Sequence, residues 1–149
     1  MTTELPTIFT VGYEKRSVDD LISVLKARDV DRVVDVRLTP FSRRPGFSKT
    51  RLDAALADAG IDYEHAGGLG NPPEIRDLYL CGNTKAGHRA FREHLRNGAS
   101  AALSELAATS AQVKVALLCL ERDPQRCHRQ VIAAALAEQT GGQRLVVHL

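Results

Sequence analysis

One segment near the carboxyl end of the chain gathers side chains that could do chemistry. Cys119-Leu120-Glu121 is followed, after a short polar stretch, by Cys127-His128-Arg129. The glutamate could act as a general base, the histidine could donate a proton, and the arginine could hold a phosphate. Cys127 could be a nucleophile, because the positive end of a helix lowers the pKa of a thiol. The alternatives are a small buried hydrophobe for Cys127 and a packed or capping role for His128.

A second candidate pair lies in Val33-Val34-Asp35-Val36-Arg37, where an acid and a base alternate on one face of an apolar segment. Charged residues are usually kept out of cores unless they are paired, so a structural ion pair is one interpretation. The functional interpretation gives Asp35 a base or ribose-binding role and Arg37 a phosphate contact.

Residues 37–51 carry a cluster of cations and no acid. With Phe41 and Phe47 among them, these residues suit base stacking combined with phosphate contact. A solvated loop whose phenylalanines cover the core explains the same pattern. The cations are Arg37, Arg43, Arg44, Lys49 and Arg51.

Two other motifs give weaker signals. The cysteines lack the Cys-x-x-Cys spacing that structural zinc prefers, so we expect no metal, and nothing indicates a cofactor. The segment 67–72, Gly-Gly-Leu-Gly-Asn-Pro, matches neither a P-loop nor a dinucleotide fingerprint. It is either a flexible connector or a place where backbone approaches a ligand.

Strand-like and helix-like segments alternate in the order needed to position these residues. Strands are predicted at 8–12, 33–36, 61–65, 112–120 and 144–148, and helices at 18–28, 50–59, within 86–108 and at 124–139. Ser17 and Asp123 are the predicted N-caps of the first and last helices, and the long helical region should break near Asn97-Gly98. This alternation predicts one three-layer, Rossmann-like α/β domain over residues 1–149, with a mainly parallel sheet of about five strands.

Ligands of such sheets bind beyond the carboxyl ends of the strands. Asp35 and Glu121 end two different apolar strands, so their carboxylates should meet at one edge of the sheet. We therefore expect Asp35, Arg37, Glu121 and His128 to line a single pocket. Arginine nearby should keep both carboxylates ionised, which favours base roles.

Bulk properties limit the classes of protein that remain. The chain has 149 residues, 44% hydrophobic and 26% charged, which is ordinary globular composition. Its longest apolar run, Val115–Leu120, is far too short to cross a bilayer, and we expect no membrane association. The first residues carry an acid and no basic region, so a cytoplasmic location is expected. The odd number of cysteines, three, argues against a disulfide framework. The net charge of +2 argues against a large nucleic-acid binding surface. Nothing in the sequence indicates the oligomeric state.

Taken in order, several motifs resemble the domain-of-unknown-function 488 family over nearly the whole chain. They are Thr10–Glu14, Val34–Arg37 with Pro40 and Ser42-Arg43, Gly46–Lys49, Leu69–Pro72, Cys119–Glu121 with Pro124, and Cys127–Arg129. Many relatives have Gly-His-Ser where this chain has Gly12-Tyr13-Glu14. The resemblance implies a compact α/β fold and no settled reaction.

Three functional hypotheses follow. The first is an enzyme, with hydrolase or glycosidic-bond chemistry and a carboxylate base, acting on a phosphorylated, nucleotide-like or nucleic-acid substrate. The second is a cysteine-dependent enzyme that uses Cys127. The third is a non-catalytic nucleotide or nucleic-acid binding module, so the expected partner is a phosphate-bearing small molecule or a nucleic acid. The candidate catalytic residues are Asp35, Glu121, Cys127 and His128, and the candidate substrate-binding residues are Tyr13, Arg37, Ser42, Arg43, Asn71 and Arg129.

Overall fold

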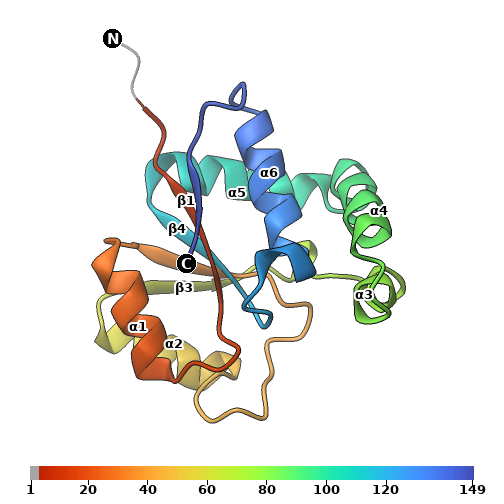
Figure 1. Cartoon of the computed structure of the whole chain (residues 1–149). Coiled ribbons are helices and arrows are strands. Elements are labelled where there is room, and N and C mark those ends of the chain that lie inside the picture. The colour runs from red at the N-terminus through yellow and green to blue at the C-terminus, as the bar shows by residue number, and fades with distance from the viewer. Residues whose placement is uncertain (1–3) are drawn as a thin grey trace.

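The computed structural model describes residues 4–149 and builds them around a five-stranded sheet (Figure 1). Its strands are β1 (Ile8–Gly12), β2 (Arg32–Asp35), β3 (Asp62–His65), β4 (Val115–Cys119) and β5 (Val146–His148). They lie in the order β3-β2-β4-β1-β5, and every neighbouring pair is parallel. The predicted α/β class, parallel sheet and strand number are confirmed.

Helices cover both faces of the sheet and complete three layers (Figure 1). On one face lie α1 (Val18–Ala27) and α2 (Lys49–Asp58); on the other lie α4 (Thr84–Arg96), α5 (Ser100–Gln112) and α6 (Arg129–Glu138), with α3 (Pro73–Leu80) packed against α4. Alternate residues of β4 serve the two cores, since Leu117 packs toward the second set and Leu118 toward the first. None of the helices within residues 4–149 is long and apolar enough to cross a membrane.

Local signals explain several element boundaries. The Ser17 hydroxyl accepts from the amide of Asp20 at 3.0 Å, and the Asp20 carboxylate accepts from the amide of Ser17 at 3.1 Å. This is the predicted capping box of α1. The predicted break of the long helical region falls at Asn97, the C-cap of α4. Strands β1 and β4 are buried along their whole length, which accounts for their continuous apolar sequence.

The predicted start of the last helix is wrong. The Asp123 carboxylate accepts from the amide of Gln125 at 2.9 Å, but it caps a single 3-10 turn, η2 (Pro124–Arg126). The chain is extended at Cys127, and α6 begins only at Arg129. The reason is tertiary: the fully buried side chain of Arg129 donates to the carbonyls of Glu121 and Arg122, which ties the helix start to the strand exit.

Other boundaries also differ from expectation. Helix α3 occupies a segment to which no helix was assigned, because its eight residues hold only one apolar repeat, Ile75, Leu78 and Tyr79, directly after the glycine- and proline-rich segment. The strand predicted from residue 112 begins at Val115, since Gln112 still belongs to α5. The last strand covers Val146–His148 rather than 144–148.

Candidate functional site

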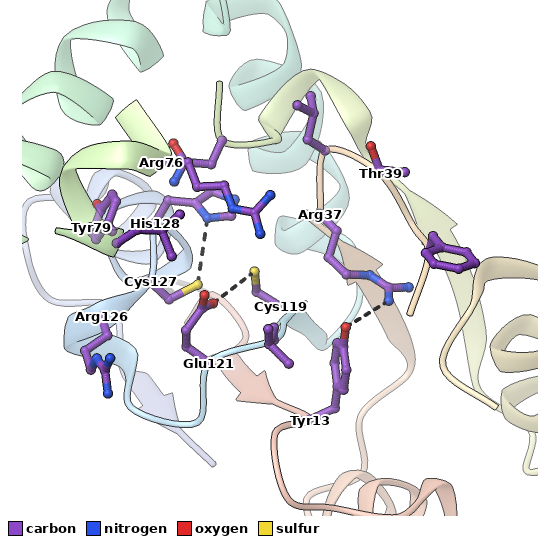
Figure 2. Close-up of a pocket in the computed structure, with 15 residues that line it drawn as sticks. Tyr13, Arg37, Thr39, Arg76, Tyr79, Cys119, Glu121, Arg126, Cys127 and His128 are labelled. Carbon is purple, nitrogen blue, oxygen red and sulfur yellow. Dashed lines mark hydrogen bonds between the residues drawn. The ribbon is translucent and has the colours of Figure 1, made fainter. Parts of the chain in front are cut away.

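A cavity of about 350 Å³ opens where β1, β2 and β4 end (Figure 2). Tyr13 follows β1, Arg37 follows β2 and Glu121 follows β4, so the site lies beyond the carboxyl ends of parallel strands. Helix α3 supplies another wall. The cavity is lined by Tyr13, Arg37, Leu38, Thr39, Phe41, Asn71, Arg76, Tyr79, Leu80, Cys119, Leu120, Glu121, Arg126, Cys127 and His128.

Cys127 and His128 form a thiol–imidazole pair on this cavity. The Sγ atom of Cys127 lies 3.7 Å from Nδ1 of His128, and Nε2 of the same ring lies 2.8 Å from the carbonyl oxygen of Val36. A carbonyl oxygen can only accept, so Nε2 carries a proton and donates it. Nδ1 is therefore directed at the thiol. The edge contact with Phe91, at a ring distance of 4.9 Å, holds the imidazole plane from the other side.

The same contacts favour the ionised form of the pair. Burial opposes ionisation of Cys127, but the hydrogen bond from Cys119 and the positive charge of His128 outweigh it, and the pKa of Cys127 falls well below its ordinary value. Burial also opposes a charge on His128, yet the neighbouring thiolate raises the pKa of that ring. Both shifts favour the thiolate–imidazolium form of the pair over the neutral form.

Two further groups stand beside Cys127. Cys119 donates to Oε2 of Glu121 across 3.7 Å, and the neighbouring sulfur of Cys127, together with burial, raises the pKa of Cys119. Burial, followed by the charge of Cys127, raises the pKa of Glu121. This shift is opposite in direction to the one that a neighbouring arginine was expected to cause. The guanidinium of Arg37 is turned to a different carboxylate.

The gathered donors bear on metal binding. The sulfurs of Cys119 and Cys127 and a ring nitrogen of His128 all lie within 4.8 Å of one another. Such a group could hold a metal ion, although its spacing along the chain gave no such signal. The expectation of no metal stays a prediction.

The remaining lining combines positive charge with apolar surface. Figure 2 shows the guanidinium of Arg76 projecting into the pocket, whereas Arg126 extends away from the cysteines. The side-chain oxygen of Asn71 has no hydrogen-bond partner among residues 4–149. Arg76 was not among the residues chosen from the sequence. Proline is common at the first position of a helix, so Pro72-Pro73 could have predicted a helix that carries Arg76. Four exposed apolar side chains also line the cavity: Leu38, Phe41, Leu80 and Leu120.

Asp35 lies beneath this pocket and does not line it. Its carboxylate is fully buried and accepts from Nε and Nη2 of Arg37 at 2.8 and 2.7 Å, and from the hydroxyl of Tyr63 at 2.5 Å. Arg37 is 6% exposed and also donates to the carbonyl of Phe47 at 2.8 Å and to the hydroxyl of Tyr13 at 3.3 Å. Arg37 and Tyr13 thus line the cavity, but their polar atoms are already hydrogen-bonded within the protein.

Three other sequence candidates lie outside the pocket. The guanidinium of Arg129 is occupied by backbone carbonyls, as described above. Ser42 and Arg43 line a separate, shallow surface cavity, where the hydroxyl of Ser42 accepts from the amide of Arg44 at 3.1 Å. The structure therefore brings together Tyr13, Arg37, Asn71, Glu121, Cys127 and His128, and leaves out Asp35, Ser42, Arg43 and Arg129.

Two glycines let backbone segments meet around the site. A Cβ atom on Gly12 would lie 1.9 Å from the carbonyl oxygen of Glu121, so only glycine lets the β4 exit cross the end of β1. A Cβ atom on Gly70 would lie 2.5 Å from the Cα atom of Leu38. The glycine-rich segment thus packs against the loop after β2, and the close approach of its backbone to a ligand stays a prediction.

Comparison with known proteins adds a family and no activity. Neither the curated proteins nor the solved structures contain a match to this chain. The family model described as "Domain of unknown function DUF488" matches residues 17–136. That match covers most of the chain and contains the Asp35–Arg37 pair together with Cys119, Glu121 and Cys127–Arg129. The chain therefore belongs to the DUF488 family.

Proposed function

We propose that this protein is an enzyme that attacks a small phosphate-bearing substrate with the thiolate of Cys127. One observation carries the proposal: a thiol on a cavity wall lies 3.7 Å from an imidazole nitrogen whose opposite nitrogen is fixed by a backbone carbonyl. A nucleophile, a base and a group that orients the base are the parts that covalent catalysis requires. Of the three sequence hypotheses, the cysteine-dependent enzyme has the most support.

The reaction is a hydrolysis in two steps. The Cys127 sulfur forms a bond to the electrophilic centre, and the bond from that centre to the leaving oxygen breaks. Glu121, whose pKa is raised by burial, donates a proton to that oxygen. The resulting Glu121 carboxylate then takes a proton from water, whose oxygen attacks the same centre and releases the Cys127 thiolate. Glu121 thus acts first as acid and then as the carboxylate base expected from the sequence.

The lining of the cavity supports an anionic substrate with an apolar part. Arg76 and Arg126 bring positive charge to the lining, and Asn71 offers an amide. Phe41, 65% exposed, gives the rim a flat apolar surface on which a ring could stack. A nucleotide-like molecule combines these features, with its phosphate near Arg76 and its base on the rim.

A second candidate function rests on the separate surface cavity. That cavity is lined by residues between Pro40 and Arg51, which form the loop after β2 and the first turn of α2, and the exposed Phe41 lies within this segment. Exposed cations beside an aromatic ring suit a nucleic-acid strand. This interpretation requires no catalysis. The cationic side chains are Arg43, Arg44, Lys49 and Arg51.

Alkylation and hydrolysis test the proposal together. Iodoacetamide should modify Cys127 faster than it modifies glutathione near neutral pH, and inorganic phosphate should slow the reaction by occupying the cavity. The protein should also release phosphate from p-nitrophenyl phosphate or from a member of a nucleotide panel. The Cys127→Ser variant should lose this activity, and the Cys81→Ser variant, which changes an exposed thiol outside the site, should keep it. Slow alkylation of Cys127 without hydrolysis by wild type would contradict the proposal.

A further inference from the structure

A second thiol, that of Cys119, lies beside Cys127 and takes no part in the proposed hydrolysis. Cys119 is the last residue of β4, is 7% exposed and lines the same cavity. Its sulfur lies within 4.8 Å of the Cys127 sulfur. Two thiols in contact at one cavity can exchange electrons as well as protons.

The backbone at both cysteines allows a bond between them. Cys119 ends a strand, and Cys127 is extended, with φ −138° and ψ 144°, two residues before α6 begins. Neither side chain is held in a helical turn, so no helix has to unwind for the sulfurs to close from within 4.8 Å to the bonding distance of about 2 Å. The connection between them is the loop that contains η2, part of which is exposed.

We propose that Cys127 is a site of reversible oxidation by hydroperoxides and that Cys119 is its resolving cysteine. The inference rests on the nucleophilic Cys127 of the proposed function. It adds a substrate class, small hydroperoxides, that the hydrolytic mechanism does not use. It also explains why a weakly acidic thiol is kept within reach of a thiolate on a cavity wall.

The first step forms a sulfenic acid. The Cys127 thiolate attacks the terminal oxygen of the hydroperoxide, an S–O bond forms, and the O–O bond breaks. The alkoxide or hydroxide that leaves takes a proton from the His128 imidazolium. The Cys127 sulfur is oxidised by two electrons, and the peroxide oxygens are reduced by the same two.

The second step forms the disulfide. The Cys119 thiol gives its proton to His128, which the first step left neutral and whose ring nitrogen lies within 4.8 Å, and the Cys119 sulfur attacks the Cys127 sulfur. An S–S bond forms, the S–O bond breaks, and the departing hydroxide takes that proton from His128 and leaves as water. The sum is two thiols and one hydroperoxide giving one disulfide, one alcohol or water, and one water. An external dithiol restores the nucleophile.

Peptide mapping without reduction tests this pair. Wild type and the Cys119→Ser, Cys127→Ser and Cys81→Ser variants are treated with equimolar hydrogen peroxide, with and without dimedone, and remaining thiols are then blocked. Wild type and Cys81→Ser should lose both thiols of the pair, yield a Cys119–Cys127 cross-link, and regain both thiols with dithiothreitol. Cys119→Ser should instead accumulate a dimedone adduct on Cys127, and Cys127→Ser should give neither product. If a serine variant misfolds, the alanine variant of the same cysteine replaces it, provided that its circular dichroism spectrum matches that of wild type.

The possible outcomes separate the resolving role of Cys119 from the nucleophilic role of Cys127. If iodoacetamide modifies Cys127 quickly but peroxide leaves Cys119 a free thiol, the resolving role is wrong and the nucleophile stands. A cross-link of Cys127 to Cys81, or between two chains, would also overturn the resolving role. If Cys127 reacts with neither iodoacetamide nor peroxide, both proposals are wrong.

Discussion

The ends of the adjacent strands β2 and β4 carry polar groups of the same general kind, yet the two groups are built differently. At the end of β2, Asp35 and Arg37 form a bidentate ion pair whose atoms are 2.7–2.8 Å apart. At the end of β4, the contacts of Cys127 with His128 and of Cys119 with Glu121 are each 3.7 Å long. The first group uses its bonding capacity internally, and the second has polar atoms that still face a cavity.

This difference separates a structural pair from a chemical one. A buried charge that is fully hydrogen-bonded gains nothing from a ligand and loses much if a partner is removed. Thiols on a cavity wall and a carboxylate with a raised pKa can change partners during a reaction. We therefore expect substitutions at the end of β2 to affect stability and substitutions at the end of β4 to affect chemistry.

The largest expected effect is the loss of catalysis in the Cys127→Ser variant. Removal of a covalent nucleophile should lower kcat by on the order of 10⁴-fold, because the remaining groups cannot form the intermediate. The melting temperature should stay close to that of wild type, since serine is similar in size. Steady-state hydrolysis and thermal unfolding, measured on the same preparation, check both parts. A variant that keeps more than a tenth of wild-type kcat would show that Cys127 is not the nucleophile.

At the other strand end, Asp35→Ala should unfold more easily by about 3–5 kcal/mol, because it leaves the buried Arg37 without its partner. The matched control is Asp62→Ala on neighbouring β3. Asp62 faces Arg32 across 3.8 Å with a side chain that is 75% exposed, and its loss should cost about 1 kcal/mol or less. Urea unfolding of both variants measures the contrast. Equal effects would mean that burial does not separate the two pairs.

Much of this arrangement could be predicted from sequence, because it depends on local patterns. Apolar strands alternating with amphipathic helices gave the parallel sheet, and the sheet gave the edge where Arg37, Glu121 and His128 meet. The different roles of Asp35 and Glu121 could not be predicted. Both carboxylates follow apolar strands, and they differ only in partners that come from elsewhere in the chain. Asp35 accepts from the hydroxyl of Tyr63 and the guanidinium of Arg37, and Glu121 accepts from neither.

The start of α6 shows the same limit from another side. Asp123-Pro124 is a valid capping signal, and the local turn it predicts exists. The buried Arg129 decides where the α-helix begins, because its guanidinium donates to the carbonyls of Glu121 and Arg122. Sequence periodicity therefore placed Cys127 and His128 near the site, but it assigned Cys127 to a helix that the backbone starts later.

A smaller effect should follow from His128→Gln, which removes the charge that lowers the pKa of Cys127. In wild type the thiolate should persist below the ordinary thiol pKa of about 8.5. Iodoacetamide should therefore react at a lower pH with Cys127 than with glutathione. The variant should move the midpoint of this pH profile upward and lower kcat by about 10²-fold. An unchanged midpoint would show that His128 does not lower the pKa of Cys127.

The smallest effect concerns Arg76, which contributes charge and no bond to the reacting centre. Arg76→Ala should raise KM for a phosphorylated substrate by roughly five- to tenfold, about 1 kcal/mol for a solvent-exposed ionic contact, and should leave kcat nearly unchanged. The control is Arg43→Ala with Arg44→Ala, which removes more charge but from the separate surface cavity. If substrate binding depends on the pocket, the single change raises KM more than the double change does, and added salt narrows the difference. If instead the double variant is the weaker binder and Arg76→Ala matches wild type, the anion binds the loop after β2. The cluster at the end of β4 would then act on a group that extends from that loop.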